Sequence, residues 1–291
     1  MRIGILGAGG MADALGTQWA RAGHEVMISG RDASASAARA ATMTAEAART
    51  RTEMADARSG AAEMASARGV AAGAPAAEVV GEPIGVAGAG GQVAGARGVA
   101  AGAAAAEAAG GPTGVAGAGA QVAGARTEVV GVRAGSWAEA AAFGEVVMVA
   151  VRQAGLTGVL ASAGGALRGK PVIDVANAEG PYDPARPIAP LIRDLTGGHV
   201  VKAFNLCHVD VWRLTPPVFD GRPLAVPLCG DDPAALAAVR TLVADLGCTP
   251  VDGGGLERAM LLEATAAFMI GLWFGGADAQ AVLPPVAYSG A

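Results

Sequence analysis

Three small residues near the N-terminus have the spacing of a phosphate-binding turn. Gly7, Gly9 and Ala12 occupy the small-residue positions of G-x-G-x-x-G/A, after an apolar run that ends at Leu6. The first glycine allows a tight turn, the second lets the backbone approach a pyrophosphate, and the third residue lets the next helix pack closely on the strand. Free N–H groups at the start of that helix then face the phosphates. The pattern predicts a dinucleotide site, which we assign to Gly7, Gly9, Gly10, Met11 and Ala12.

The sequence around this motif has the order of elements that such a turn needs. The chain holds 45 glycines, so the motif by itself could arise from composition. It nevertheless leads into a segment whose apolar residues Met11, Leu15 and Trp19 recur at i, i+4 and i+8. A second apolar run follows at 26–28. We therefore expect residues 2–31 to fold as strand, turn, helix and strand.

The end of the second strand indicates which dinucleotide is bound. An NAD site places Asp or Glu there, on the ribose 2′-hydroxyl. This chain has Ser29 at that place and Arg31 two residues later, a hydroxyl and a guanidinium group that suit a 2′-phosphate. The nearby Asp32 has the offset of a helix cap instead. NADP(H) is favoured over NAD, with Ser29 and Arg31 on the phosphate.

Outside residues 45–126, strand-like apolar runs alternate with helix-like segments. Ser136 and Glu139 have the spacing of a capping box, and Asp232 followed by Pro233 indicates another helix start. The alternation predicts an α/β fold, a Rossmann-type doubly wound parallel sheet that binds ligands at the carboxyl ends of its strands. Beyond residue 31, strands are expected at 128–132, 146–151, 171–175, 200–203, 224–228 and 249–251.

Several polar residues follow the expected strands. By position, we assign Val151, Arg152 and Asn177 to the cofactor, and Asn205 and His208 to the substrate. His208 is the one histidine at the carboxyl end of an expected strand, so it is also the candidate catalytic proton donor; a polar loop residue is the alternative. Lys202 falls inside an apolar run, which favours a structural role.

A duplicated segment interrupts this pattern. Residues 98–126 repeat residues 69–97 at 23 of 29 positions, and both copies consist largely of Gly and Ala. They offer little apolar surface for a core. We expect three parts: a Rossmann domain at 1–44 and 127–252, an insert at 45–126 that is helical before the repeat, and a small C-terminal helical segment at 253–291.

Composition argues against several classes of protein. The net charge of −5 gives no polybasic surface for nucleic acid. Cys207, Cys229 and Cys248 are too few and too widely spaced for a disulfide framework or a zinc cluster, and they fit a reducing cytoplasm.

The N-terminus lacks an apolar signal region. An apolar run at 264–277 is shorter than the roughly 20 residues that a membrane-spanning helix needs, so a buried or dimer-interface helix is expected. The expected partner is a small-molecule redox substrate, with no metal, nucleic acid or membrane.

The motifs of this chain resemble those of the NADPH-dependent reductases of coenzyme F-420, a deazaflavin. That resemblance is carried, in the family's order, by IGILGAGGMADALG at 3–16, ISGRD at 28–32, VIDVAN at 172–177, VVKAFN at 200–205 and the block from 227 to 263.

The resemblance implies NADP binding by the glycine turn, with Ser29 and Arg31 on the 2′-phosphate. It also implies a deazaflavin site that faces the nicotinamide, and a homodimer whose C-terminal helix, at about 256–274, contributes to the cleft. The chain departs from the family at Arg152 and Ala178, where proline is usual.

Hydride transfer between a nicotinamide and a deazaflavin or flavin ring needs the two rings face to face, and the redox chemistry belongs to the cofactors. The sequence has no Ser-His-Asp, metal-ligand or paired-carboxylate constellation that predicts another chemistry. Two alternatives stay open. One is an NADPH-dependent reductase of a small ketone or imine, which would need a general acid such as His208. The other is a non-catalytic NADP(H)-binding protein.

Overall fold

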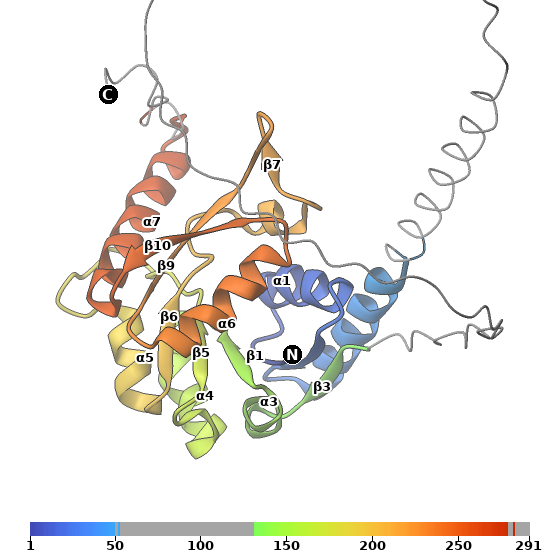
Figure 1. The fold of residues 1–291 in the computed structure, drawn as a ribbon. Coiled ribbons are helices and arrows are strands. Elements are labelled where there is room, and N and C mark those ends of the chain that lie inside the picture. The colour runs from blue at the N-terminus through green and yellow to red at the C-terminus, as the bar shows by residue number, and fades with distance from the viewer. Residues whose placement is uncertain (50–51, 53–130, 279–281, 283–291) are drawn as a thin grey trace, which may run out of the picture. The chain divides into compact units, whose positions relative to one another are not determined.

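The computed structural model describes residues 1–49, 52, 131–278 and 282 (Figure 1). The chain divides into two compact units, Met1–Gly60 with Glu128–Ala291 and Ala61–Thr127. The second unit and the duplicated repeat at 69–126 lie outside the described residues. The sheet, its helices and the candidate site all belong to the first unit.

An eight-stranded sheet forms the centre of this unit, in the order β10-β9-β6-β5-β4-β1-β2-β3. All neighbouring pairs are parallel except β6 and β9, which are antiparallel. The expected α/β doubly wound fold is confirmed, with a mostly parallel sheet. The strands are β1 (Arg2–Leu6), β2 (Glu25–Ser29), β3 (Arg133–Gly135), β4 (Val146–Val149), β5 (Pro171–Asp174), β6 (His199–Lys202), β9 (Ala225–Gly230) and β10 (Thr249–Gly254).

Helices cover both faces of the sheet because successive strand residues are buried on opposite sides. Within β4, Met148 joins one core cluster while Val147 and Val149 join the other. The first cluster contains residues of α1 (Gly10–Arg21), of the helix at 33–49 and of α6 (Pro233–Ala244). The second contains residues of α3 (Trp137–Phe143), α4 (Leu156–Ala163) and α5 (Ile188–Thr196). Alternation along a strand thus places helices on both faces.

Two predicted helix starts are confirmed. The Ser136 hydroxyl accepts from the backbone N–H of Glu139, whose carboxylate accepts from the Ser136 N–H, so the capping box begins α3 as expected. The Asp232 carboxylate accepts from the N–H of Ala235 at the start of α6.

The strand expected at 128–132 is displaced. Residues 128–130 lie outside the described part of the chain, residues 131 and 132 are not in a strand, and β3 begins at Arg133. The N–H of Val132 donates instead to the hydroxyl of Thr44 at 2.8 Å. This contact holds the chain beside the helix at 33–49 until pairing with β2 begins.

The C-terminal helix is present where it is expected: a 3-10 turn, Leu256–Arg258, leads into α7 (Ala259–Phe274), which packs against α5. A small hairpin of β7 (Val218–Phe219) and β8 (Arg222–Pro223) is an addition to the predicted elements. Further 3-10 turns lie at Gln153–Gly155, Gly164–Leu167 and Val209–Arg213. Within the described ranges, no helix has the length and apolar character to cross a membrane.

Candidate functional site

A cavity of about 490 Å³ opens at the carboxyl ends of β1, β2 and β4. We call it the glycine-turn pocket. It lies beside the point where strand order reverses between β1 and β4, the usual ligand position in a doubly wound sheet. Its lining residues are Gly7, Ala8, Gly9, Gly30, Arg31, Asp32, Ala35, Ser36, Trp137, Ala150, Val151, Arg152, Ala154, Gly155 and Val159.

The glycine turn has the backbone geometry that its sequence predicts. Gly7 has φ of +146°, and a Cβ there would collide with the carbonyl oxygen of Ala150. A Cβ at Gly9 would meet no described atom within 4 Å, so the backbone is open to a ligand at that point. Gly9 is the N-cap of α1, and no side chain of the described residues caps this helix. The start of α1 is therefore a suitable place for an anion. Ala12 is fully buried between α1 and the sheet.

The expectation for Ser29 is corrected. This side chain is completely buried and does not line the pocket; its hydroxyl donates to the carbonyl of Ile5 at 2.9 Å. The Ser29 carbonyl accepts from the N–H of Gly7, also at 2.9 Å. Ser29 therefore ties the glycine turn to β2 and offers no hydroxyl to a phosphate.

Arg31 lies at the mouth of the pocket, as expected, and is exposed. Asp32 caps the helix at 33–49, because its carboxylate accepts from the N–H of Ala35 at 2.9 Å. Of the two residues assigned to a 2′-phosphate, only Arg31 lines the pocket.

Trp137 is a pocket residue that the sequence assignment missed. It is the first residue of α3, is partly buried against the core and lines the cavity just after β3 ends. The capping box that positions Trp137 also acts on Glu139, because hydrogen bonds from the Ser136 backbone N–H and hydroxyl hold the pKa of the Glu139 carboxyl below its usual value. The sequence contains a signal for this pocket residue, because an aromatic residue directly follows the serine that caps the helix after a strand.

Val151 and Arg152 line the pocket as expected, after β4. The Arg152 side chain is 91% exposed and its Nε lies 3.8 Å from Glu179. Glu179 also accepts from the N–H of Ala154 at 3.3 Å and donates its own N–H to Gln153 at 3.1 Å. These contacts join the loops after β4 and β5. A second cavity, of about 340 Å³, is lined by Gln153 and Glu179.

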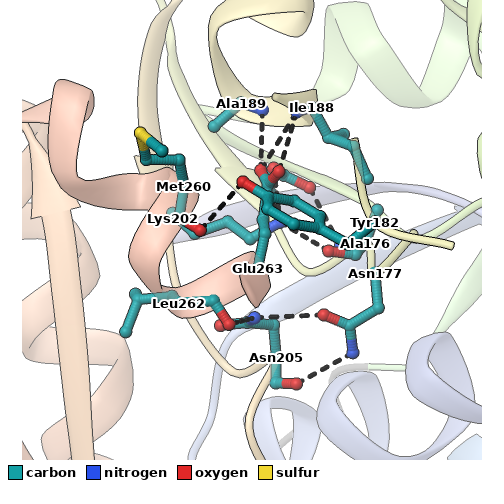
Figure 2. Close-up of polar contacts among 11 residues, drawn as sticks. Ala176, Asn177, Tyr182, Ile188, Ala189, Lys202, Asn205, Met260, Leu262 and Glu263 are labelled. Atoms are coloured by element: carbon teal, nitrogen blue, oxygen red, sulfur yellow. Dashed lines mark hydrogen bonds and ion pairs between the residues drawn. The ribbon is translucent and has the colours of Figure 1, made fainter. Parts of the chain in front are cut away.

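Asn177 and Asn205, assigned to cofactor and substrate, form a pair at the carboxyl ends of β5 and β6 (Figure 2). The side-chain amide of Asn177 donates to the Asn205 carbonyl at 2.9 Å, and the Asn205 amide donates to Asn177 Oδ1 at 3.0 Å and to the Leu262 carbonyl at 3.1 Å. Neither residue lines the glycine-turn pocket. Asn205 Oδ1 is buried and has no hydrogen-bond partner among the described residues. The pair is brought together as neighbouring strand ends predict, and contact with a ligand remains a prediction.

Next to this pair lies a buried ionic cluster (Figure 2). The side chains of Lys202, Asp174 and Glu263 are all fully buried, and Lys202 Nζ lies 2.9 Å from Asp174 and 3.4 Å from Glu263. Glu263 also accepts from the N–H groups of Ile188 and Ala189 at the start of α5. The cluster thus connects β5, β6, α5 and α7.

Tyr182 lies beside this cluster and lines the second cavity. Its hydroxyl donates to the Met260 carbonyl at 3.0 Å. Burial, followed by the nearby charges of Glu263 and Asp183, raises the pKa of Tyr182. Ionisation of the phenol is therefore less favourable here than in water.

His208 does not lie at the glycine-turn pocket. Its side chain is 65% exposed, and Nδ1 lies 3.3 Å from the carboxylate of Asp210. It is the N-cap of the 3-10 turn Val209–Arg213, which packs against α1. A role of His208 as proton donor stays a prediction, with a polar loop residue as the alternative.

Comparison with protein families matches residues 2–65 to the model described as NADP oxidoreductase, coenzyme F-420-dependent. The matched segment includes the glycine turn and Arg31. The resemblance inferred from the motifs is thereby confirmed over this N-terminal part of the chain.

Solved structures of low sequence identity share the fold. A proposed F-420-dependent NADP reductase from Arthrobacter sp. FB24 is 21% identical, with a TM-score of 0.58 over 94% of this chain and 95% of that protein. A hypothetical protein from Sinorhizobium meliloti is 18% identical, with a TM-score of 0.53 over 89% and 87%. An imine reductase from Streptomyces aurantiacus is 13% identical, with a TM-score of 0.51 over 94% of this chain but 62% of that protein.

Proposed function

We propose that this chain is an oxidoreductase that binds NADP(H) in the glycine-turn pocket and transfers a hydride between it and a deazaflavin or flavin-type acceptor. The observation that carries the proposal is that one pocket contains both the uncapped start of α1 and Arg31. The family match over residues 2–65 supports it.

The residues at the turn suit a pyrophosphate. The open space at Gly9 lets phosphate oxygens approach the N–H groups of Gly10 and Met11, at the positive end of the α1 dipole. Asp13 places a carboxylate in the same helical turn, but it is buried and lies 3.2 Å from Arg39 and 2.6 Å from Arg213. These two arginines offset its charge, so the pocket stays suitable for an anion.

Arg31 is the residue that distinguishes the phosphorylated dinucleotide in this proposal. It follows β2, where the ribose of the adenosine half is expected, and its exposed guanidinium group can donate two parallel hydrogen bonds to a 2′-phosphate. The adjacent Asp32 is engaged as a helix cap, so its carboxylate does not replace the ribose-binding acid of an NAD site.

Hydride transfer to a ring acceptor needs fewer protein groups than transfer to a carbonyl or imine. When bound, NADPH supplies the hydride from its nicotinamide ring, and a ring acceptor must chiefly be held face to face with it. A ketone or imine also needs a proton from a general acid. The family match, described as coenzyme F-420-dependent, therefore carries the choice of a ring acceptor in this proposal.

A homodimer in a reducing cytoplasm is part of the same proposal. Helix α7 exposes Leu261 and Phe268, which lie two turns apart on the same side of the helix, and burial of these side chains between two copies would remove apolar area from water. The three cysteines form no disulfide, which fits a reducing compartment.

The test follows nicotinamide absorbance when the purified protein and NADPH are mixed with a deazaflavin, flavin mononucleotide, or a simple ketone or imine. We expect binding of NADPH and turnover with the deazaflavin or the flavin. Turnover with ketones or imines alone would contradict the proposed acceptor. Binding without any turnover would support a non-catalytic NADP(H)-binding protein, and failure to bind NADPH would contradict the whole proposal.

A further inference from the structure

The glycine-turn pocket has an apolar wall in addition to the residues proposed to bind phosphate. Trp137 of α3 and Val159 of α4 contribute to it, together with Ala154 of the loop after β4. The inference drawn from this wall rests on the proposed NADP(H) binding.

The order of the strands locates the two halves of the dinucleotide. The pyrophosphate lies at β1, the strand that ends in the glycine turn, and Arg31 follows β2 on one side of it. Trp137 follows β3, one strand further in the same direction, whereas Asn177 and Asn205 follow β5 and β6 on the opposite side. The half that carries the 2′-phosphate therefore extends toward Trp137, and the nicotinamide half extends away from it.

The position of Trp137 is fixed by the backbone around it. β3 pairs with β2 up to Gly135, and the Ser136–Glu139 capping box then sets where α3 begins. The indole is partly buried against the core cluster on that face and also borders the cavity. A side chain held in this way loses little conformational freedom when a ligand binds.

An indole beside an apolar cavity suits a flat heteroaromatic base. Stacking of a base on an aromatic side chain is worth about 1–3 kcal/mol by alanine substitution, and it needs no hydrogen-bond donor. We infer that Trp137 stacks on the adenine of the bound dinucleotide and that it is a determinant of affinity for the adenosine half.

The experiment compares the wild-type chain with Trp137→Ala and Trp137→Phe. Isothermal titration measures the Kd for adenosine 2′,5′-bisphosphate, which holds the adenine and the 2′-phosphate without a nicotinamide, and for reduced nicotinamide mononucleotide, which holds no adenine. Trp137→Ala should weaken binding of the bisphosphate by about fivefold to 150-fold, the range that loss of one stacked aromatic predicts. Binding of the mononucleotide should not change.

The phenylalanine variant protects the test against a folding defect. A phenyl ring still stacks, so Trp137→Phe should bind the bisphosphate nearly as well as the wild type while losing most of the tryptophan fluorescence quenching that binding produces. Trp273→Phe is the matched control, because Trp273 is exposed on α7 and does not line the pocket; its quenching should be unchanged.

Two failures are distinguishable. If the wild type binds the bisphosphate and Trp137→Ala binds it equally well, or if quenching persists in Trp137→Phe, the inference is wrong while the proposed function stands. If the wild type binds neither the bisphosphate nor NADPH, the proposed function fails and takes the inference with it.

Discussion

Ser29 and Arg31 are two residues apart, and the structure gives them different environments. A serine at the end of β2 can turn its hydroxyl toward a ligand or toward the neighbouring strand, and both choices fit the same sequence pattern. Register decides between them, because Ser29 pairs with Leu6 and its hydroxyl reaches the Ile5 carbonyl. The glycine turn, the Asp32 cap and the position of Arg31 were predictable from local chemistry. The Ser29 contact was not, since it depends on a neighbouring strand.

This difference predicts that one of two alanine substitutions lowers the selectivity for NADPH over NADH and that the other leaves it unchanged. Arg31→Ala should weaken NADPH by about tenfold to a hundredfold, the value of hydrogen bonds to a charged group, and leave NADH nearly unchanged. Ser29→Ala is the matched control: it loosens the turn that both dinucleotides share, so any loss should be equal for NADPH and NADH. Titration of each variant with both nucleotides measures the ratio of the two Kd values. A selective loss of NADPH in Ser29→Ala, or equal losses in Arg31→Ala, would contradict the assignment.

At the scale of elements, the apolar runs predicted the strands of the large sheet to within a few positions, except β3, which begins only after the expected 128–132 ends. They did not predict that β9 is antiparallel to β6, because pairing direction depends on the path of the connection between them. That connection includes the β7–β8 hairpin, which has Asp220 and Gly221 at positive φ in its turn. An Asp-Gly dipeptide is the usual signal for such a turn. The turn signal was therefore present in the sequence, but the strands on either side of it have only two residues each, which is too short for an alternating pattern.

Four elements meet at the buried cluster, and this gives a stability prediction. Lys202 is the cation between Asp174 and Glu263, and all three side chains are fully buried. Lys202→Met should lower the free energy of unfolding by about 3–5 kcal/mol, because removal of one partner leaves buried carboxylates uncompensated. Denaturant unfolding followed by circular dichroism measures this change.

A second variant separates charge from packing. Glu263→Gln added to Lys202→Met removes one of the two stranded charges and keeps the side-chain volume, so it should recover part of the lost stability. If the double variant is as unstable as the sum of the two single variants, the two side chains are not coupled and the electrostatic account fails.

At the scale of the whole molecule, the two described ranges 1–49 and 131–278 contact each other close to the gap between them. Thr44, near the end of one described range, hydrogen-bonds with the N–H of Val132, near the start of the next. Among the described residues, those that line the pocket fall within 7–36 and 137–159. The proposed Rossmann domain at 1–44 and 127–252 therefore has its two parts joined by direct contacts, although 88 positions separate these two residues in sequence.

Deletion of the duplicated repeat, residues 69–126, should leave NADPH binding unchanged. The described lining residues of the pocket come from both sides of the repeat, and the contact of Thr44 with Val132 keeps β3 beside the helix at 33–49. Residues 45–68 remain in this variant and span the junction, so closure of the shortened connection costs little, because loop entropy changes slowly with length. The Kd for NADPH and the midpoint of thermal unfolding are the two measurements, with the full chain as reference. A large loss of NADPH affinity at an unchanged unfolding midpoint would mean that the repeat takes part in the cofactor site, and would contradict a Rossmann domain complete without it.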